Sequence, residues 1–289
     1  MTFGAYKPGL LIDPAREYAG AVRLVDIGLE VGEGVRQEAR VEALQHADVA
    51  RLLPVPAAES DKYRRGVVGS RRGPRGTGAA VLAVAGALRG GAGGAVRRAG
   101  GGGRDRPSSG DAGVGPGPKH AGRVQAWVVG PGAGDDAATV GEVLAADVPV
   151  LIDADGLRLA EVGVVRGRRA PTLMTPHAGE RRRCLVSSGR RWRRGGWPRC
   201  GVGGRYGATV LLKGSTTLVA SAGRGGAGEG AGVVRVNPTG TPWLATAGSG
   251  DVLSGSGVVA GGGVAGDGRG SVAAYLHGLA GRFAAEGRR

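Results

Sequence analysis

Short apolar runs alternate with helix-like segments over most of this chain. Four runs are typical of buried strands: 124–129, 148–152, 172–175 and 208–212. Residues 218–220 follow the last run as a hairpin partner, and helices are predicted at 79–89, about 137–146 and 271–286. Strands that alternate with helices indicate a mostly parallel sheet covered on both faces, which is an α/β fold.

The polar loops of this pattern follow the predicted strands directly. They include 130–134, 153–156, 176–180 and 213–217. In a parallel sheet the carboxyl ends of the strands share one edge, and ligands bind at that edge. We therefore expect the functional site there.

The first sixty residues have a different organisation. A strand-like piece at 22–27 is followed by a connector at 30–60, which contains a polar helical stretch near 35–50 and then Pro54 and Pro56. We expect 1–29 to be a separate piece, 30–60 to be a linker and 61–289 to be one domain.

Four segments break the pattern because they are rich in Gly or Arg and show neither a strand nor a helix period: 70–77, 98–120, 181–204 and 256–270. Two explanations stay open. The segments are disordered insertions of an Arg/Gly RNA-binding type, or they are out-of-frame translations of a GC-rich gene, which yield mainly Arg, Gly, Ala and Pro. We favour the second, which would leave a damaged and inactive copy of an enzyme. Reading the coding DNA in all three frames decides between them.

Composition limits the classes of function. The 289 residues are 41% hydrophobic and only 4% aromatic, with 61 glycines and a formal net charge of +15. Such a charge alone would suggest a nucleic-acid partner. However, three of the irregular segments, 70–77, 98–120 and 181–204, carry net charges of +3, +2 and +8, so the remainder is close to neutral.

Targeting and metal signals are lacking in the sequence. The first residues have no signal-peptide core, and no apolar run approaches the length of a membrane span. Cys184 and Cys200 show no metal-binding spacing. We expect a cytoplasmic protein with no membrane partner, no specific nucleic-acid partner and no metal held by a protein cluster.

The segment 237–255 is the most informative stretch. Gly248, Ser249 and Gly250 run into Asp251 and an apolar pair, which predicts a small-residue turn that opens a helix. The free N–H groups of a helix N-terminus form an anion site. A carboxylate beside that site is suited to take a proton from a hydroxyl that attacks a phosphate. The plainer interpretation is a glycine-rich loop with a capping aspartate.

Taken together, the motifs resemble the ADP/ATP-dependent NAD(P)H-hydrate dehydratase family. The matching pieces are 62–69, 78–83, 87–93, 129–134, 152–157, 173–180, 212–217, 237–255 and 274–281. The resemblance implies a ribokinase-like three-layer α/β/α fold. It also implies ADP-dependent dehydration of NAD(P)H hydrate to NAD(P)H with release of AMP and phosphate, with ADP (or ATP) and Mg²⁺ as cofactors and a homotetrameric assembly.

The same resemblance assigns roles to the polar loops. Asp251 would be the base, and the N–H groups of Gly248, Ser249 and Gly250 would stabilise negative charge. The adenylate would lie on Gly250 and on the loop Lys213, Gly214, Ser215, Thr216 and Thr217. The hydrated dinucleotide would contact Asp251, Ala79, Gly130, Gly132, Gly134 and His177. Asp153 and Asp155 would position substrate or Mg²⁺, or form turns.

Residues 2–29 resemble the end of an NAD(P)H-hydrate epimerase domain, without its active site, so no epimerase activity is expected. Two other functions stay open at this point. One is a small-molecule kinase of the ribokinase superfamily, which would leave a stable phosphorylated product. The other is an Arg/Gly-rich nucleic-acid-binding protein, which would bind RNA in a salt-sensitive way.

Overall fold

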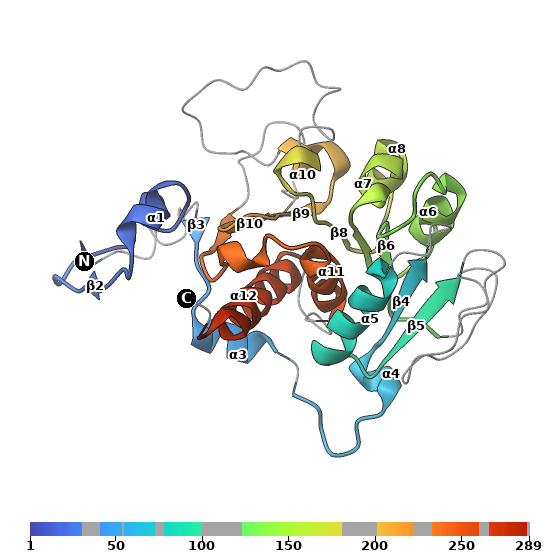
Figure 1. Ribbon diagram of the computed structural model, residues 1–289, viewed down its shortest axis with the longest axis horizontal. Helices are drawn as coiled ribbons and strands as arrows, with labels where there is room; N and C mark the ends of the chain where they lie inside the picture. Colours follow the sequence, from blue (N-terminus) through green and yellow to red (C-terminus); the bar gives the residue numbers. More distant parts are fainter. Residues whose placement is uncertain are drawn as a thin grey trace.

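A central sheet of nine strands, counted over the described residues, organises the computed structural model (Figure 1). The structure describes residues 1–30, 41–53, 55–72, 78–99, 123–180, 201–221, 233–259 and 266–287. In spatial order the strands are β3 (Val41–Glu42), β11 (Val234–Asn237), β10 (Thr217–Ala220), β9 (Thr209–Leu212), β8 (Thr172–Met174), β7 (Val150–Ile152), β6 (Ala126–Val129), β4 (Val67–Arg72) and β5 (Gly94–Ala99). Strand β10 pairs antiparallel with both neighbours, and the other pairs are parallel.

Side chains of the central strands alternate between two hydrophobic cores. Val128, Leu151 and Leu173 belong to one core, whereas Val129 and Ile152 belong to the other. Because successive side chains of a strand point to opposite faces, a strand that is apolar throughout must be covered on both sides. The sheet is therefore the middle of three layers, as the ribokinase-like α/β/α interpretation requires.

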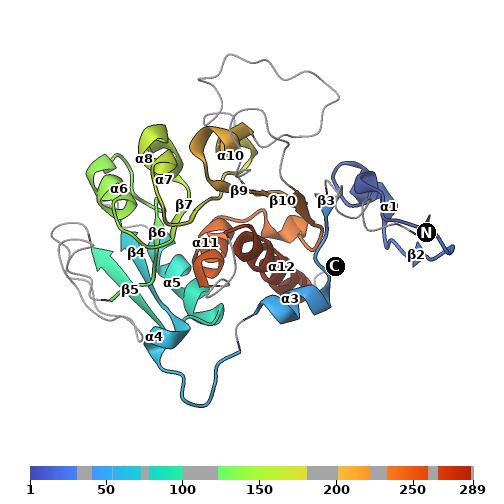
Figure 2. The ribbon, with the colours of Figure 1, turned by 180° about the vertical axis from the view of Figure 1, so that it is seen from behind.

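Two groups of helices supply the outer layers (Figures 1 and 2). One core contains residues of α3 (His46–Leu52), α5 (Ala79–Arg89), α11 (Ser249–Val259) and α12 (Gly266–Ala285). The other contains residues of α6 (Ala137–Leu144), α7 (Asp155–Leu159), α8 (Val162–Arg166) and α10 (Gly201–Tyr206). Among the described residues, no helix is both long enough and apolar enough to span a membrane.

The structure corrects part of the expected linker at 30–60. Strand β3 extends the main sheet beside β11, and α3 places Val49 in the core with an exposed fraction of 2%. Residues 41–53 are therefore an integral part of the domain. The sequence pattern indicated a helical stretch near 35–50, but it could not show that the two residues of β3 pair with β11 or that Val49 is buried in the core.

The irregular segments are also shorter than the sequence suggests. The ends of β4, β5, α10 and α11 and the start of α12 extend into them, at 70–72, 98–99, 201–204, 256–259 and 266–270. What remains of these four segments lies outside the described residues. The two explanations of their composition therefore stay predictions.

The first thirty residues form a small unit beside the edge of the main sheet (Figure 1). Strands β1 (Thr2–Phe3) and β2 (Leu24–Val25) pair in parallel, and the short helices η1 (Pro8–Leu10) and α1 (Ala15–Ala19) lie between them in the chain. The unit contacts the main domain through Asp13, which accepts hydrogen bonds from the hydroxyls of Ser215 and Thr216. The N-terminal unit is therefore attached directly to the loop after β9.

Candidate functional site

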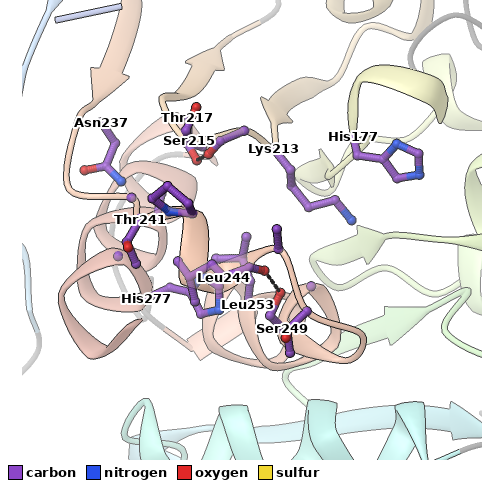
Figure 3. Close-up of a pocket in the computed structure, with 18 residues that line it drawn as sticks. His177, Lys213, Ser215, Thr217, Asn237, Thr241, Leu244, Ser249, Leu253 and His277 are labelled. Carbon is purple, nitrogen blue, oxygen red and sulfur yellow. Dashed lines mark hydrogen bonds between the residues drawn. The ribbon is translucent and has the colours of Figure 1, made fainter. Parts of the chain in front are cut away.

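A cavity of about 590 Å³ lies at the carboxyl edge of the sheet (Figure 3). Its walls come from the loop after β9, the segment 240–246 with the short helix η4 (Pro242–Leu244), the start of α11 and the middle of α12. The predicted site residues in the wall are His177, Lys213, Gly214, Ser215, Thr217, Ser249 and Gly250. The edge predicted from the polar loops that follow the strands therefore does hold a cavity.

The first turn of α11 shapes one end of this cavity. Gly248 precedes the helix at φ +89°, and a Cβ there would lie 2.5 Å from Cδ1 of Leu82. The positive φ favours glycine, whereas the contact is with the end of a leucine side chain that can move aside. The Ser249 hydroxyl donates to the Leu244 carbonyl at 2.6 Å, which holds η4 against the helix.

The amides of this turn are not equally free to bind an anion. The Ser249 N–H already donates to the Thr246 carbonyl at 3.3 Å, so the structure gives this predicted donor another partner. The N–H groups of Gly250 and Asp251 lie in the first turn of the helix, where no helical carbonyl precedes them. These two amides are the better candidates for contact with a phosphate.

Asp251 is half-buried on the same turn. Burial raises the pKa of its carboxyl group above the ordinary value, and the nearby Asp153 carboxylate raises it further. The Lys213 ammonium opposes both effects. The carboxyl group therefore holds a proton more tightly than an exposed aspartate, as a proton acceptor in a reaction must.

A buried ion pair fixes the position of Lys213. Its Nζ lies 2.7 Å from Oδ1 of Asp153, a residue that is 1% exposed. The second Asp153 oxygen lies 2.5 Å from the Ser254 hydroxyl on α11. This network joins the ends of β7 and β9 to α11. It also places the ammonium beside Gly250, where a Cβ would lie 3.3 Å from Nζ.

His177 stands at the open end of the cavity. Its Nδ1 accepts from the Gly179 N–H at 3.0 Å, and its Nε2 lies 3.4 Å from Oε1 of Glu180. The His177 backbone N–H also donates to the Glu180 carboxylate at 2.9 Å, which stabilises the loop 177–180 further. The side chain is thus held in an exposed position, from which it can meet a bound molecule.

Other predicted residues lie outside the cavity wall: Ala79, Gly130, Gly132, Gly134, Thr216, Gly248 and Asp251. Gly130 has a clear structural role, since at φ +116° its Cβ would lie 1.8 Å from the Asp153 carbonyl oxygen. Gly134 donates its N–H to Oδ2 of Asp155 at 2.8 Å, which gives Asp155 a turn-forming role. Roles of these glycines in substrate binding stay predictions.

The cavity also contains residues that the sequence motifs did not single out. Asn237, Thr241 and Leu244 line it from the 237–246 stretch, and His277 lines it from α12 (Figure 3). Burial lowers the pKa of His277, although a hydrogen bond with the Ser249 backbone acts in the opposite direction. A neutral imidazole here can brace the start of α11. The only sequence signal for these residues was their place in two of the matching blocks.

Comparison with known proteins identifies the family. The family model described as NAD(P)H-hydrate dehydratase matches residues 69–288. The chain belongs to the NAD(P)H-hydrate dehydratase family. The match spans the cavity, every strand of the sheet except β3 and the start of β4, and the helices of both layers except α3, and it confirms the resemblance found in the motifs.

Curated relatives of this dehydratase-family chain are longer proteins. It is 40% identical over 262 residues to the bifunctional NAD(P)H-hydrate repair enzyme Nnr of Mycobacterium leprae, covering 88% of this chain and 51% of the relative. It is 33% identical over 329 residues to the Moorella thermoacetica enzyme of the same name, covering 100% of this chain and 58% of the relative. The chain spans little more than half the length of these two relatives.

Solved structures confirm the fold of this family member. A Bacillus subtilis ADP/ATP-dependent NAD(P)H-hydrate dehydratase, co-crystallized with ATP/Mg²⁺, superposes with a TM-score of 0.65 at 23% identity, over 86% of this chain and 91% of that one. A ribokinase-like superfamily protein from Enterococcus faecalis gives a TM-score of 0.65 at 20% identity, over 86% and 89%. The ribokinase-like fold class is therefore correct.

Proposed function

We propose that this chain catalyses the ADP-dependent dehydration of NAD(P)H hydrate, with release of NAD(P)H, AMP and phosphate. The observation that carries the proposal is the raised pKa of Asp251 on a helix N-terminus beside the Lys213 ammonium. The cation and the start of α11 thus lie in the wall of a cavity large enough for a nucleotide, and the base follows Gly250 directly, just outside that wall. Family membership supplies the substrate class.

The proposed reaction has two stages. Asp251 takes the proton of the hydroxyl on the hydrated nicotinamide ring as its oxygen attacks the β-phosphorus of ADP. The bond from that phosphorus to the bridging oxygen breaks, and AMP leaves. The phosphate then departs from the ring with its C–O bonding pair, a neighbouring carbon loses a proton, and the double bond of NAD(P)H is restored.

Protein groups near Asp251 suit the first stage. Phosphoryl transfer depends mainly on positioning and on stabilising the charge of the phosphate oxygens. The Lys213 ammonium and the N–H groups of Gly250 and Asp251 are donors on the side of the cavity where Asp251 lies. Ionised Asp251 would repel a phosphate, so its role is to receive the proton rather than to bind the anion.

Mg²⁺ fits this site as a companion of the nucleotide. Among the described residues, no group of three or more His, Cys, Asp or Glu side chains could hold a metal ion. Mg²⁺ commonly uses phosphate oxygens, water and one or two carboxylates, so the phosphates of the nucleotide would supply most of its ligands. When bound, Mg²⁺ would neutralise part of the negative charge of the phosphates.

A product assay tests the proposal. Purified protein with NAD(P)H hydrate and ADP should release NAD(P)H, AMP and phosphate in equal amounts, and omission of ADP should abolish all three. Recovery of the dihydronicotinamide absorbance and separation of nucleotides by chromatography give the readouts. A stable phosphorylated product without NAD(P)H would instead identify a kinase.

The pH profile should respond in opposite directions to two substitutions. Asp153→Asn removes a negative neighbour, which lowers the pKa of Asp251, so the acid limb of kcat/KM should move to lower pH. Lys213→Gln removes the opposing positive charge, so the same limb should move to higher pH. The midpoint pH of the acid limb is compared between each variant and the wild-type protein, because both substitutions also lower the maximum kcat/KM. Shifts of both variants in one direction would contradict Asp251 as the titrating base.

A further inference from the structure

One buried side chain of α11 makes contacts that the proposed chemistry does not use. Ser254 lies one helical turn after Gly250 and is 0% exposed. Its hydroxyl oxygen lies 2.5 Å from Oδ2 of Asp153 and 2.9 Å from the Gly250 carbonyl oxygen. A hydroxyl group has one hydrogen to donate, so these two oxygens compete for it.

Distance and charge decide which oxygen receives the Ser254 hydrogen. A hydrogen bond to an ionised group is shorter and stronger than one to a neutral carbonyl, and the contact with Asp153 is the shorter of the two. Asp153 is ion-paired with Lys213, so its carboxylate has no hydrogen of its own to give. The Ser254 hydroxyl therefore donates to Oδ2 of Asp153.

The Asp153 carboxylate is thus held at both of its oxygens. Nζ of Lys213 lies 2.7 Å from Oδ1, and the Ser254 hydroxyl donates to Oδ2. Asp153 is 1% exposed, so water does not readily replace either donor. A carboxylate that lost the Ser254 donor would turn about its Cβ–Cγ bond, because a buried oxygen that loses its partner is costly. Such a rotation would move the oxygen that holds Lys213.

Lys213 has a second carboxylate within reach. Oε2 of Glu180 lies 4.0 Å from Nζ, whereas Oδ1 of Asp153 lies 2.7 Å from it. Glu180 contacts His177, and in the view of Figure 3 the Lys213 side chain extends into the space between His177 and Ser249. A shift toward Glu180 would therefore take the ammonium away from the start of α11. The orientation of Asp153 determines which of the two places the ammonium occupies.

We propose that Ser254 is a positioning residue for phosphate binding: its hydroxyl orients Asp153, and Asp153 holds the Lys213 ammonium beside the first turn of α11. The proposal rests on the proposed function, because it takes ADP as the molecule whose phosphates Lys213 meets. Ser254 is fully buried, so it acts through Asp153 and not by contact with the nucleotide. Helix α11 thus provides amides for the phosphates and also fixes the cation that acts with them.

Calorimetric binding of ADP tests this role without relying on turnover. Ser254→Ala should weaken ADP binding about fivefold in the wild-type background, and less than about twofold once Lys213→Gln has removed the ammonium. Ser256→Ala is the matched control, because the Ser256 hydroxyl also contacts the carbonyl four residues before it, at 3.0 Å on the same helix. This control should bind ADP like the wild-type protein. Unchanged binding by Ser254→Ala, equal losses in both backgrounds, or a similar loss in Ser256→Ala would overturn the proposal.

Ser254→Cys gives a second test that holds even if the alanine variant fails to fold. A thiol has nearly the same shape as the hydroxyl but is a weak donor. This variant should therefore bind ADP about threefold more weakly than the wild-type protein, and pyrophosphate, which lacks the nucleoside, should show the same loss. A loss confined to ADP would overturn a role in phosphate binding. If the wild-type protein binds no ADP at all, the proposed function fails with it. Tight ADP binding that is equal in wild-type protein and Ser254→Cys rejects the role of Ser254 alone.

Discussion

Asp251→Asn should reduce kcat for NAD(P)H-hydrate dehydration by about a thousandfold, within the range that a positioned base supplies. Asparagine has nearly the same shape, so the first turn of α11 and the nearby Lys213 should keep their positions. What disappears is the acceptor for the hydroxyl proton. Steady-state measurement of NAD(P)H release should show the loss in kcat, with the affinity for ADP changed far less.

The same variant should be at least as stable as the wild-type protein at neutral pH. The pKa of Asp251 is higher in the folded chain than in the unfolded chain, so the folded state binds more protons between those two values. Its free energy of unfolding therefore falls as pH rises through that window, and the ionised carboxylate is a cost above it. Thermal unfolding at pH 7 gives the comparison. Retained activity would exclude Asp251 as the base. A large fall in Tm would show that the ionised Asp251 carboxylate does not lower the stability of the folded protein.

Gly255→Ala should destabilise the domain by at least about 3 kcal/mol, the upper part of the usual range for overpacking. A Cβ at Gly255 would lie 1.8 Å from the Ala83 carbonyl oxygen of α5. Gly86 makes the reciprocal contact, since its Cβ would lie 2.2 Å from the Val252 carbonyl oxygen. Both overlaps are with backbone atoms, so no change of side-chain rotamer can relieve them. Helix α11 would have to move, and Asp251 would move with it.

Gly141→Ala is the matched control for this prediction. Gly141 lies within α6, and a Cβ there would meet no atom within 4 Å. Alanine favours helix, so this variant should gain about 0.5–1 kcal/mol. Urea unfolding of both variants gives the free energies. Similar effects at Gly141 and Gly255 would show that close helix contact does not determine the cost.

The hydrophobic pattern and the alternation of strands with helices predicted much of the fold from the sequence. The apolar runs at 126–129 and 150–152 are buried throughout, as strands covered on both faces must be, and their alternation with helical segments predicted a parallel sheet. The helix 79–89 was predicted with the bounds that the structure shows, because small residues repeat along it without interruption. The loop after β9 and the start of α11 were located by residue types that serve phosphate chemistry.

Other features depend on contacts between distant residues. Strand β3 has two residues, and only its pairing with β11 makes it a strand. The sequence could place Gly130 in a loop, but not show that it approaches the Asp153 carbonyl. Spatial neighbours far apart in sequence determine both features.

The contact between Asp13 and the loop after β9 would couple the N-terminal unit to any nucleotide that binds that loop. Burial raises the pKa of Asp13, but hydrogen bonds from Ser215 and Thr216 outweigh this and leave it lowered, so the ionised carboxylate is the form that is bound. A nucleotide that uses either hydroxyl must compete with Asp13. Coupling between two binding equilibria is reciprocal. If such a nucleotide changes the equilibrium constant for docking of residues 1–30 by some factor, docking of residues 1–30 changes the affinity for the nucleotide by the same factor. Occupancy of the cavity would thus affect a polypeptide joined to that unit, through the hydroxyl groups of Ser215 and Thr216.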